Sequence, residues 1–504
     1  MADPSQQRCV NGSRRRICLA GLVVAALLAG AGCSPVDPEA VAPDTGTPNV
    51  GSASASAPDT GSASTSGSPP VQLSPAVTAQ LDAAVGQVMQ KANVPGVIVG
   101  LSIPGNGTYT KAFGVADRSS NTPMTTDLNM RIGSVTKTFT VTALLRLVDA
   151  GKVGLDDPVG KYVSGVPGGD RISLRQLADM RSGLYPYSSD QDFVNALIGN
   201  PARSFTPQEL LAYSFRHPVA FEPGSQYQYS NTNTILLGMV VEKAAGQPLQ
   251  DYLQQQVFVP AGLQRTVFPT DASFPDPHAH GYTNQTPAGS SADATDWNPS
   301  WAWAAGAVIS NLTDMQHWAA LLATGSLLNP GTQTQRLQTL PTGYPNTGYG
   351  LGLFTDNGWV GHNGSIPGYQ SLVLYLPSAR ASLVVLSNTD ANYQGSENST
   401  LFGEEITRIV TPGNVYSLPA MPTVTTSPSA SGASAPPSAS QSSSGSPTGS
   451  PSGPPTGSPS GPPSGPAGTS ASSSAVPPSA VPSGVPSVTS PFASVTGLPG
   501  AGAS

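Results

Sequence analysis

Cysteine is almost absent from the sequence, and the few cysteines lie at one end. Cys9, Cys18 and Cys33 all precede residue 34, so the rest of the chain can form neither a disulfide nor a cysteine-ligated metal site. His278 and His280 form a His-x-His pair, but no third ligand is evident beside them. We therefore expect no metal and no other cofactor, and a fold stabilised by its hydrophobic core alone.

Charged residues are also scarce. They make up 10% of the 504 residues, against roughly a quarter in ordinary globular domains, and no Asp, Glu, Lys or Arg follows Arg408. The net charge of −7 and the lack of a basic block argue against a nucleic acid partner. Residues 34–72 and 411–504 are rich in Pro, Ser, Gly, Ala and Thr, a composition that cannot bury a core. We predict a disordered linker and a disordered tail.

The apolar run near the N-terminus is short. Three arginines, at 14–16, precede an apolar stretch over 17–31 that ends at Gly32 and Cys33, and a membrane-spanning helix needs roughly 20 apolar residues. This pattern predicts an export signal over 1–33. The stretch ALLAGAGC resembles a bacterial lipoprotein signal, in which Cys33 becomes lipidated. We expect an exported protein held at the outer face of the membrane by that lipid alone; ordinary cleavage or an uncleaved anchor is the alternative.

Residues 73–410 carry the periodic patterns of a folded domain. Ser74 and Pro75 begin a helix, and two short strands follow it. A long insertion of helices and loops comes next. Strands at 359–364, 369–376 and 382–388 and a helix at 398–410 follow it. This order predicts a mixed α/β (α+β) fold, in which terminal helices flank an antiparallel sheet and a mostly helical subdomain is inserted.

The first candidate functional pair is Ser134 and Lys137. If a helix begins here, both side chains project from the same face of its first turn. The serine N–H would be among the unpaired donors of that turn, and a desolvated lysine can take the serine proton. Lys137 is the only one of the six lysines with a serine three residues before it. Ser134 as a simple helix N-cap is the alternative.

A second segment offers Tyr229 and Asn231. They stand at the entry of a helix that ends at Gly246, and acyl transfer needs a proton donor for the leaving group and an amide that positions the substrate. The alternative is a buried tyrosine followed by an asparagine that caps the helix.

The third segment is GHNGSIPGY. A glycine on a strand lets a substrate backbone approach closely, which is the role expected of Gly364. The N–H of Ser365 would be the second oxyanion donor beside that of Ser134, and each such donor typically lowers the barrier by about 3 kcal/mol. His362 would lie in the same site; a solvated histidine on an edge strand is the alternative.

Together these motifs resemble those of the serine penicillin-recognising hydrolases, in the branch that includes class C β-lactamases, D-alanyl-D-alanine carboxypeptidases and esterases. The markers are SVTK at 134–137, RSGLY at 181–185, YSNTN at 229–233, AGAVIS at 305–310, YGLGL at 349–353 and HNG at 362–364. The resemblance implies a β-lactamase/transpeptidase-like fold and an acylated Ser134. It also implies that Lys137 and Tyr229 share the proton transfers, that Asn231 holds the substrate amide and that Trp301 flanks the cleft.

His-x-Gly in place of Lys-Thr-Gly makes the chain most similar to the carboxypeptidases. The first hypothesis is an exported D-Ala-D-Ala carboxypeptidase-like enzyme of cell-wall peptide metabolism, acting as a monomer. The second is a class C-like β-lactamase or a carboxylesterase, and the third is a non-catalytic wall-binding or β-lactam-sensing protein. One departure bears on the substrate: Phe354 stands where related carboxypeptidases can place an arginine for the substrate carboxylate, and no Lys or Arg occurs between Arg336 and Arg380.

Overall fold

The computed structural model describes residues 73–418. The predicted export signal with Cys33, the linker over 34–72 and the tail from residue 419 onward lie outside the described residues. Within 73–418 no helix is both long enough and apolar enough to cross a bilayer.

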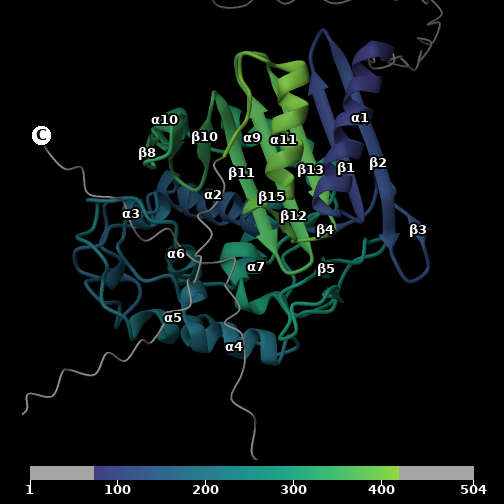
Figure 1. The fold of residues 1–504 in the computed structure, drawn as a ribbon. Coiled ribbons are helices and arrows are strands. Elements are labelled where there is room, and N and C mark those ends of the chain that lie inside the picture. The colour runs from purple at the N-terminus through teal and green to yellow at the C-terminus, as the bar shows by residue number, and fades with distance from the viewer. Residues whose placement is uncertain (1–72, 419–504) are drawn as a thin grey trace, which may run out of the picture. The chain divides into compact units, whose positions relative to one another are not determined.

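A nine-stranded antiparallel sheet forms the centre of the fold, in the order β3-β2-β1-β13-β12-β11-β10-β9-β8. The first strands of the domain therefore pair directly with the last long ones, as Figure 1 shows for β1 and β13. The strands are β1 (Gly96–Ile103), β2 (Gly107–Asp117), β3 (Thr122–Pro123), β8 (Leu340–Pro341), β9 (Thr347–Tyr349), β10 (Phe354–Asp356), β11 (Trp359–Ile366), β12 (Tyr369–Leu376) and β13 (Ala381–Ser387).

Two helices, α1 (Pro75–Ala92) and α11 (Asn398–Val410), lie side by side on one face of this sheet (Figure 1). As predicted, the Ser74 hydroxyl caps α1 by accepting from the Val77 N–H at 3.3 Å, with proline in the first turn. The apolar stripes of both helices join the sheet residues of that face in one buried cluster. The terminal helices thus cover the sheet because each presents one continuous apolar stripe to it.

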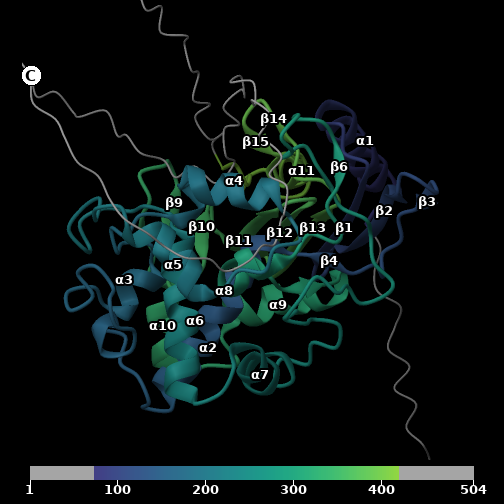
Figure 2. The same ribbon diagram turned by 90° about the horizontal axis from the view of Figure 1, so that it is seen from below.

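The opposite face of the sheet carries the helical part of the domain. Helix α9 packs against β1, β12 and β13, and α2 packs against α6 and α8 (Figure 2). The helices of this part are α2 (Thr136–Asp149), α3 (Leu174–Ala178), α4 (Gln191–Gly199), α5 (Pro207–Phe215), α6 (Asn231–Ala245), α7 (Leu249–Leu253), α8 (Trp303–Gly306), α9 (Leu312–Thr324) and α10 (Pro330–Leu337). The predicted fold class, an antiparallel sheet with terminal helices and a helical insertion, is confirmed.

Three small strand pairs complete the architecture of the described residues. They are β4 (Met130–Arg131) with β7 (Ile309–Ser310), β5 (Tyr282–Thr283) with β6 (Ala292–Asp293), and β14 (Asn392–Tyr393) with β15 (Ser396–Glu397). Strand β4 stands just before Ser134 in the chain, and β15 leads directly into α11.

The folded chain extends past Val410, where the tail was expected to begin. Tyr416 is fully buried, and the Trp359 indole N–H donates to the Asn414 carbonyl at 2.7 Å. The Ser417 N–H donates to the Asp356 carboxylate at 2.6 Å. The composition of this segment did not predict the extension, because a single buried aromatic, Tyr416, in a polar stretch gives no periodic pattern.

Candidate active site

Ser134 and Lys137 lie where a 3₁₀ turn, η1 (Gly133–Val135), leads into α2. The Lys137 Nζ donates to the Ser134 Oγ at 2.9 Å and to the Ala305 carbonyl at 2.8 Å. Ser134 stays partly accessible, whereas Lys137 is fully buried. Burial holds the pKa of Lys137 well below its ordinary value. The pair therefore combines a reachable hydroxyl with an amine that gives up its proton readily.

The N-cap alternative for Ser134 is wrong. The cap positions of η1 and α2 are Ile132 and Val135, and neither helix has a side-chain cap hydrogen bond. The helix also begins later than predicted, since η1 precedes Thr136. The Ser134 hydroxyl is thus free to interact with Lys137 rather than with the helix backbone.

Tyr229 comes just before α6, which packs on α2, and it reaches the same hydroxyl. Its phenol is hydrogen-bonded to Ser134, and the Lys137 Nζ lies 4.9 Å from the centre of its ring. Desolvation raises the pKa of the Tyr229 phenol well above its ordinary value, so the phenol carries its proton at neutral pH. Ser134, Lys137 and Tyr229 therefore form one cluster of a hydroxyl, an amine and a protonated phenol, the kinds of group that acyl transfer needs.

Asn231 is the first residue of α6 and is buried. Its side-chain Nδ2 donates to the Ser188 Oγ at 3.1 Å, and the helix N-cap is Ser230. The capping alternative for Asn231 is therefore wrong. Gly246 ends the helix with a left-handed φ of 73°, as predicted. The role of Asn231 in holding a substrate amide stays a prediction.

Strand β11 passes against the start of α2 at Gly364. A Cβ at this position would lie 2.1 Å from the Ile132 carbonyl oxygen and 2.9 Å from the Ser134 nitrogen, so only glycine allows the contact. A Cβ on Gly133 would in turn lie 2.7 Å from the Ser365 nitrogen. The backbone amides of Ser134 and Ser365 thus border the same small space.

The register of β11 shows where the Ser365 amide points. Ile366 pairs with Tyr369 across a two-residue turn, and the pair that closes such a turn is hydrogen-bonded. Hydrogen-bonded pairs alternate along an antiparallel ladder, so Ser365 falls in the other kind of pair and its N–H points away from β12. This direction is the one that an oxyanion donor paired with the Ser134 N–H requires.

His362 is buried rather than solvated, which overturns the alternative considered for it. Its Nδ1 lies 2.5 Å from the Asn363 carbonyl oxygen, and a carbonyl only accepts, so Nδ1 carries the hydrogen. The Nε2 then accepts from the Tyr349 hydroxyl at 3.0 Å. Burial and the nearby Lys137 lower the pKa of His362 to about 3. The imidazole is therefore neutral at neutral pH and adds no positive charge to the site.

Phe354 and Trp301 are both in the interior. Phe354 packs 5.4 Å from the His362 ring, so the position where an arginine was sought holds an apolar ring. Trp301 is 2% exposed and lies 6.0 Å from the Phe193 ring. Trp301 belongs to the buried hydrophobic cluster, and its place beside the cleft stays a prediction. Sequence reasoning missed Tyr349, although YGLGL was quoted as a marker.

The sequence of the domain matches a known family. Residues 81–402, more than half of the chain, match the family described as Beta-lactamase. The chain belongs to the beta-lactamase family. This assignment confirms the predicted resemblance to a family of serine hydrolases and the predicted fold.

Similar proteins of the beta-lactamase family include a D-aminopeptidase from Brucella anthropi, 30% identical over 333 residues, which are 64% of this chain and 61% of that protein. Protein flp of Staphylococcus aureus strain MW2 is 26% identical over 335 residues, 62% of this chain and 64% of that protein. The chain thus spans less than two thirds of the length of these relatives.

Two solved structures are also similar to this chain. A D-stereospecific amidohydrolase from Streptomyces sp. is 32% identical with a TM-score of 0.58, over 65% of this chain and 97% of that one. The D-amino acid amidase of Ochrobactrum anthropi SV3, solved with L-phenylalanine amide, is 31% identical with a TM-score of 0.58, over 66% of this chain and 97% of that one.

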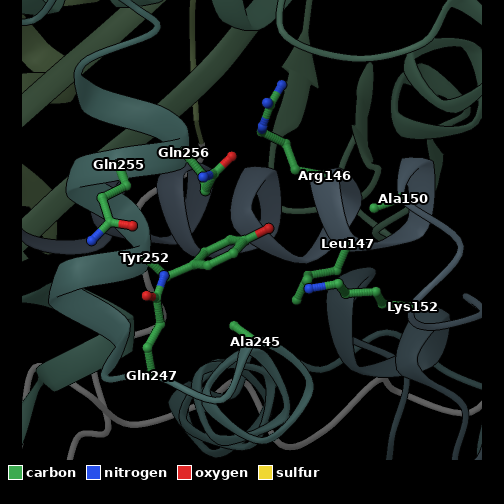
Figure 3. A pocket seen from close by; sticks show the side chains of 9 residues that line it. All are labelled: Arg146, Leu147, Ala150, Lys152, Ala245, Gln247, Tyr252, Gln255 and Gln256. Carbon is green, nitrogen blue, oxygen red and sulfur yellow. The ribbon is translucent and has the colours of Figure 1, made fainter.

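A separate cavity of about 350 Å³ lies at the far end of α2 in this beta-lactamase-family domain (Figure 3). It is lined by Arg146 and Lys152 and by residues at the end of α6 and around α7, and the Tyr252 ring crosses its middle. Helix α2 rises about 1.5 Å per residue, which puts this cavity well away from Ser134. It is not the acyl-transfer site.

The two histidines of the His-x-His pair each have a carboxylate partner of their own. The His278 Nδ1 lies 2.9 Å from Asp276, and the His280 Nδ1 lies 2.7 Å from Asp293. Across residues 73–418, no cluster of three or more His, Cys, Asp or Glu side chains could hold a metal ion.

Proposed function

We propose that this serine hydrolase forms an acyl-enzyme at Ser134 and hydrolyses amides or short peptides in which a D-amino acid is the acyl donor. The observation that carries the proposal is the 2.9 Å contact between the Ser134 Oγ and a fully buried Lys137 amine. The D-amino acid part is supported by the names of the relatives, a D-aminopeptidase, a D-stereospecific amidohydrolase and a D-amino acid amidase.

The geometry supports a balanced sequence of steps. The neutral Lys137 amine takes the Ser134 proton while the Oγ attacks the carbonyl carbon. The negative charge that forms on the carbonyl oxygen is bound by the N–H groups of Ser134 and Ser365. Tyr229 gives its proton to the leaving nitrogen as the amide bond breaks, and the proton on Lys137 restores the phenol. Water then attacks the acyl-enzyme by the reverse proton path and frees Ser134.

The D-Ala-D-Ala carboxypeptidase is the second candidate, favoured by the His-x-Gly motif at 362–364. A peptide that ends in D-Ala-D-Ala also supplies a D-alanine as the acyl donor, so the chemistry at Ser134 is the same. Such a peptide differs from an amide substrate because its leaving group carries a free carboxylate. A β-lactam or a short ester is a further donor that the same cluster would accept.

A panel of donors tests the function. Purified protein is given D-alanine amide, a peptide ending in D-Ala-D-Ala, a chromogenic cephalosporin and a nitrophenyl ester, and turnover is compared with that of Ser134→Ala. We expect hydrolysis of the D-amino acid compounds, lost in the variant, and an added acyl mass on the peptide that carries Ser134. Turnover that persists in Ser134→Ala, or no acyl adduct with any donor, would contradict the proposal and favour a non-catalytic wall-binding or sensing role.

We also propose that the protein works outside the cytoplasmic membrane as a lipoprotein monomer. The support is the signal-like sequence at 1–33 that ends at Cys33. Labelling of cells with a tagged fatty acid should mark the protein, and Cys33→Ser should abolish the label and release the protein from the membrane fraction. Light scattering of the released form measures its mass, and a dimer would contradict the monomer.

A further inference from the structure

Met180 has a backbone conformation that its residue type disfavours. It lies two positions after the end of α3, and its φ of 63° is in the left-handed region. The Met180 N–H donates to the Leu177 carbonyl at 3.4 Å, and the next N–H, that of Arg181, donates to the Gln176 carbonyl at 2.7 Å. These two bonds form a Schellman motif, whose left-handed position usually holds glycine because glycine has no Cβ to clash. A methionine at this position is an outlier, and such outliers point to a function.

The Met180 side chain accepts two hydrogen bonds at the start of α6. Its Sδ lies 3.5 Å from the Ser230 nitrogen and 3.5 Å from the Asn233 Nδ2. Ser230 is the N-cap of α6, and Met180 is only 1% exposed. A thioether is a weak acceptor, but a buried N–H that loses its acceptor costs free energy. A glycine at position 180 could make neither contact.

Met180 holds the backbone on both sides of Tyr229. On one side the Gln228 N–H donates to the Met180 carbonyl at 2.9 Å. On the other side the Ser230 N–H donates to the Met180 sulfur. Tyr229 lies between these two bonds, and its phenol is hydrogen-bonded to Ser134. The first bond needs only the backbone of Met180, whereas the second needs its side chain.

We propose that Met180 is a positioning residue for Tyr229: its sulfur fixes the start of α6 so that the phenol stays at the Ser134 hydroxyl during acyl transfer. The inference rests on the proposed function, in which Tyr229 gives a proton to the leaving group. It explains why methionine and not glycine occupies the left-handed position. A reacting group that is displaced by about 1 Å can lower a rate by about 100-fold, so the loss of one bond beside Tyr229 has a measurable effect.

Met180→Leu tests the sulfur, because leucine has a similar volume and no acceptor. An amide nitrogen needs the proton from Tyr229 in order to leave, whereas nitrophenolate leaves without one. In the variant, kcat/KM for D-alanine amide should fall by about 10- to 100-fold. The value for D-alanine nitrophenyl ester should stay within about threefold of the wild type. A role in stability alone would lower both values equally.

Met315→Leu is the matched control. Met315 is fully buried on α9, so the same exchange is made in the core but away from Tyr229. It should leave the ratio of amide to ester hydrolysis unchanged. Thermal unfolding of both variants checks that they are folded.

Met180→Asn separates the acceptor from the filling of space. Asparagine tolerates the left-handed conformation, and its side-chain oxygen lies the same number of bonds from the backbone as the methionine sulfur. Met180→Asn should therefore hydrolyse D-alanine amide faster than Met180→Leu does. Packing alone predicts the reverse order, since leucine fills the space better. If Met180→Leu does not fold, the ratio of amide to ester hydrolysis in Met180→Asn decides, and a ratio about 10-fold or more below that of the wild type overturns the inference.

The effect must also act through Tyr229. In the Tyr229→Phe background, Met180→Leu should cause no further fall in the ratio of amide to ester hydrolysis, because the group that it positions is gone. A further fall of the same size in the double variant overturns the inference. An unchanged ratio in Met180→Leu, or a Met180→Asn variant slower than Met180→Leu, overturns it as well.

Two acetate esters separate this inference from the proposed function. Ethyl acetate and nitrophenyl acetate share an acyl group that is not a D-amino acid, and only ethoxide needs a proton in order to leave. If the D-alanyl compounds are not hydrolysed but Met180→Leu slows ethyl acetate alone, the D-amino acid function fails and the inference stands. If the D-alanyl compounds react and Met180→Leu leaves the ratio of amide to ester hydrolysis unchanged, the function stands and the inference fails. No turnover of either pair overturns both.

Discussion

Lys137 on α2 and Arg336 on α10 are both fully buried, and they show why burial of a cation does not by itself create a catalytic base. Lys137 donates to the Ser134 hydroxyl and the Ala305 carbonyl, and Arg336 donates to the Thr138 carbonyl at 2.9 Å. Desolvation lowers both pKa values, that of Arg336 to about 9 and that of Lys137 well below its ordinary value. The same physical cause thus acts on two residues that lie near each other.

The two differ in chemistry and in what they face. A guanidinium begins from a pKa above 12 and an ammonium from about 10.4, so burial of the same kind leaves Arg336 charged at neutral pH and brings Lys137 closer to losing its proton. Lys137 also faces a hydroxyl whose proton it can take, whereas Arg336 faces a backbone carbonyl that has none to give. A reactive site therefore needs both a cation that can lose its proton and a partner that can supply one.

The largest effect should come from removing the amine. Lys137→Met should reduce the rate of acylation by a neutral nitrophenyl ester by about 10²- to 10⁴-fold, because general base catalysis at Ser134 is lost. Stopped-flow release of nitrophenol measures it, with thermal unfolding as a check on folding. Arg336→Met is the matched control and should acylate within a few fold of the wild type. Equal losses in the two variants would break the distinction drawn between the two cations.

Exchanging the amine for a guanidinium sharpens the comparison. Lys137→Arg keeps the positive charge near Ser134 but cannot lose its proton at working pH. Acylation should fall by at least about 100-fold at neutral pH, and raising the pH to 9 should not restore it. If the variant instead acylates at close to the wild-type rate, Lys137 acts only as an electrostatic anchor.

The converse exchange tests the environment of Arg336. A buried lysine in Arg336→Lys should lose its proton in the folded state while the unfolded chain keeps it up to about pH 10.4. Between the two pKa values the unfolded state binds more protons, so the free energy of unfolding should rise with pH by up to about 1.4 kcal/mol per unit more than in the wild type. Chemical denaturation from pH 7 to 10 measures this slope.

Lys137 itself supplies the control for that measurement. Its lowered pKa has the same sign, so Lys137→Met should lose a slope of the same size that the wild type shows between the folded pKa and about pH 10.4. If the pH slope of the unfolding free energy is the same in Arg336→Lys and Lys137→Met as in the wild type, neither position lowers the pKa of a buried amine.

The smallest effect concerns Tyr349, which bonds His362 and lies within the field of Arg336. The charge of Arg336 acts on the Tyr349 phenol, and the Tyr349 hydroxyl donates a hydrogen bond to the His362 Nε2. Tyr349→Phe frees that nitrogen, so the pKa of His362 should rise from about 3 by up to about one unit, the typical worth of one hydrogen bond. Histidine side-chain NMR from pH 3 to 8 measures it. The titration of exposed His280 should stay the same.

The periodic parts of the fold could be predicted from the sequence. Strand β12 and helix α11 have the predicted bounds, α1 begins after Ser74, and α6 ends at Gly246, as predicted. Each of these signals is local, since caps and periodicity act within a few residues. The pairing of Ser134 with Lys137 was also local, one helical turn apart. Such features need no knowledge of the rest of the chain.

The remaining parts depend on contacts between distant segments. The hydroxyl of Tyr349 bonds His362, and Asn363 bonds Glu397; neither pair has any mark in the sequence. Tyr416 is buried in a segment whose composition is that of a tail. Side-chain partners across the fold are set by the tertiary structure and not by local propensity.

The pairing of β1 with β13 has a consequence for how the domain is made. Val97 lies opposite Ser387 in the central part of the sheet, so almost the whole domain must be synthesised before its first strand finds this partner. A chain that leaves the ribosome before β13 is made would expose the unpaired edge of the β1–β2 hairpin. Such an edge can pair with another chain and cause aggregation. Contacts this far apart in sequence also make folding slow. Until β13 pairs with β1, the β1–β2 hairpin lacks its neighbour in the sheet.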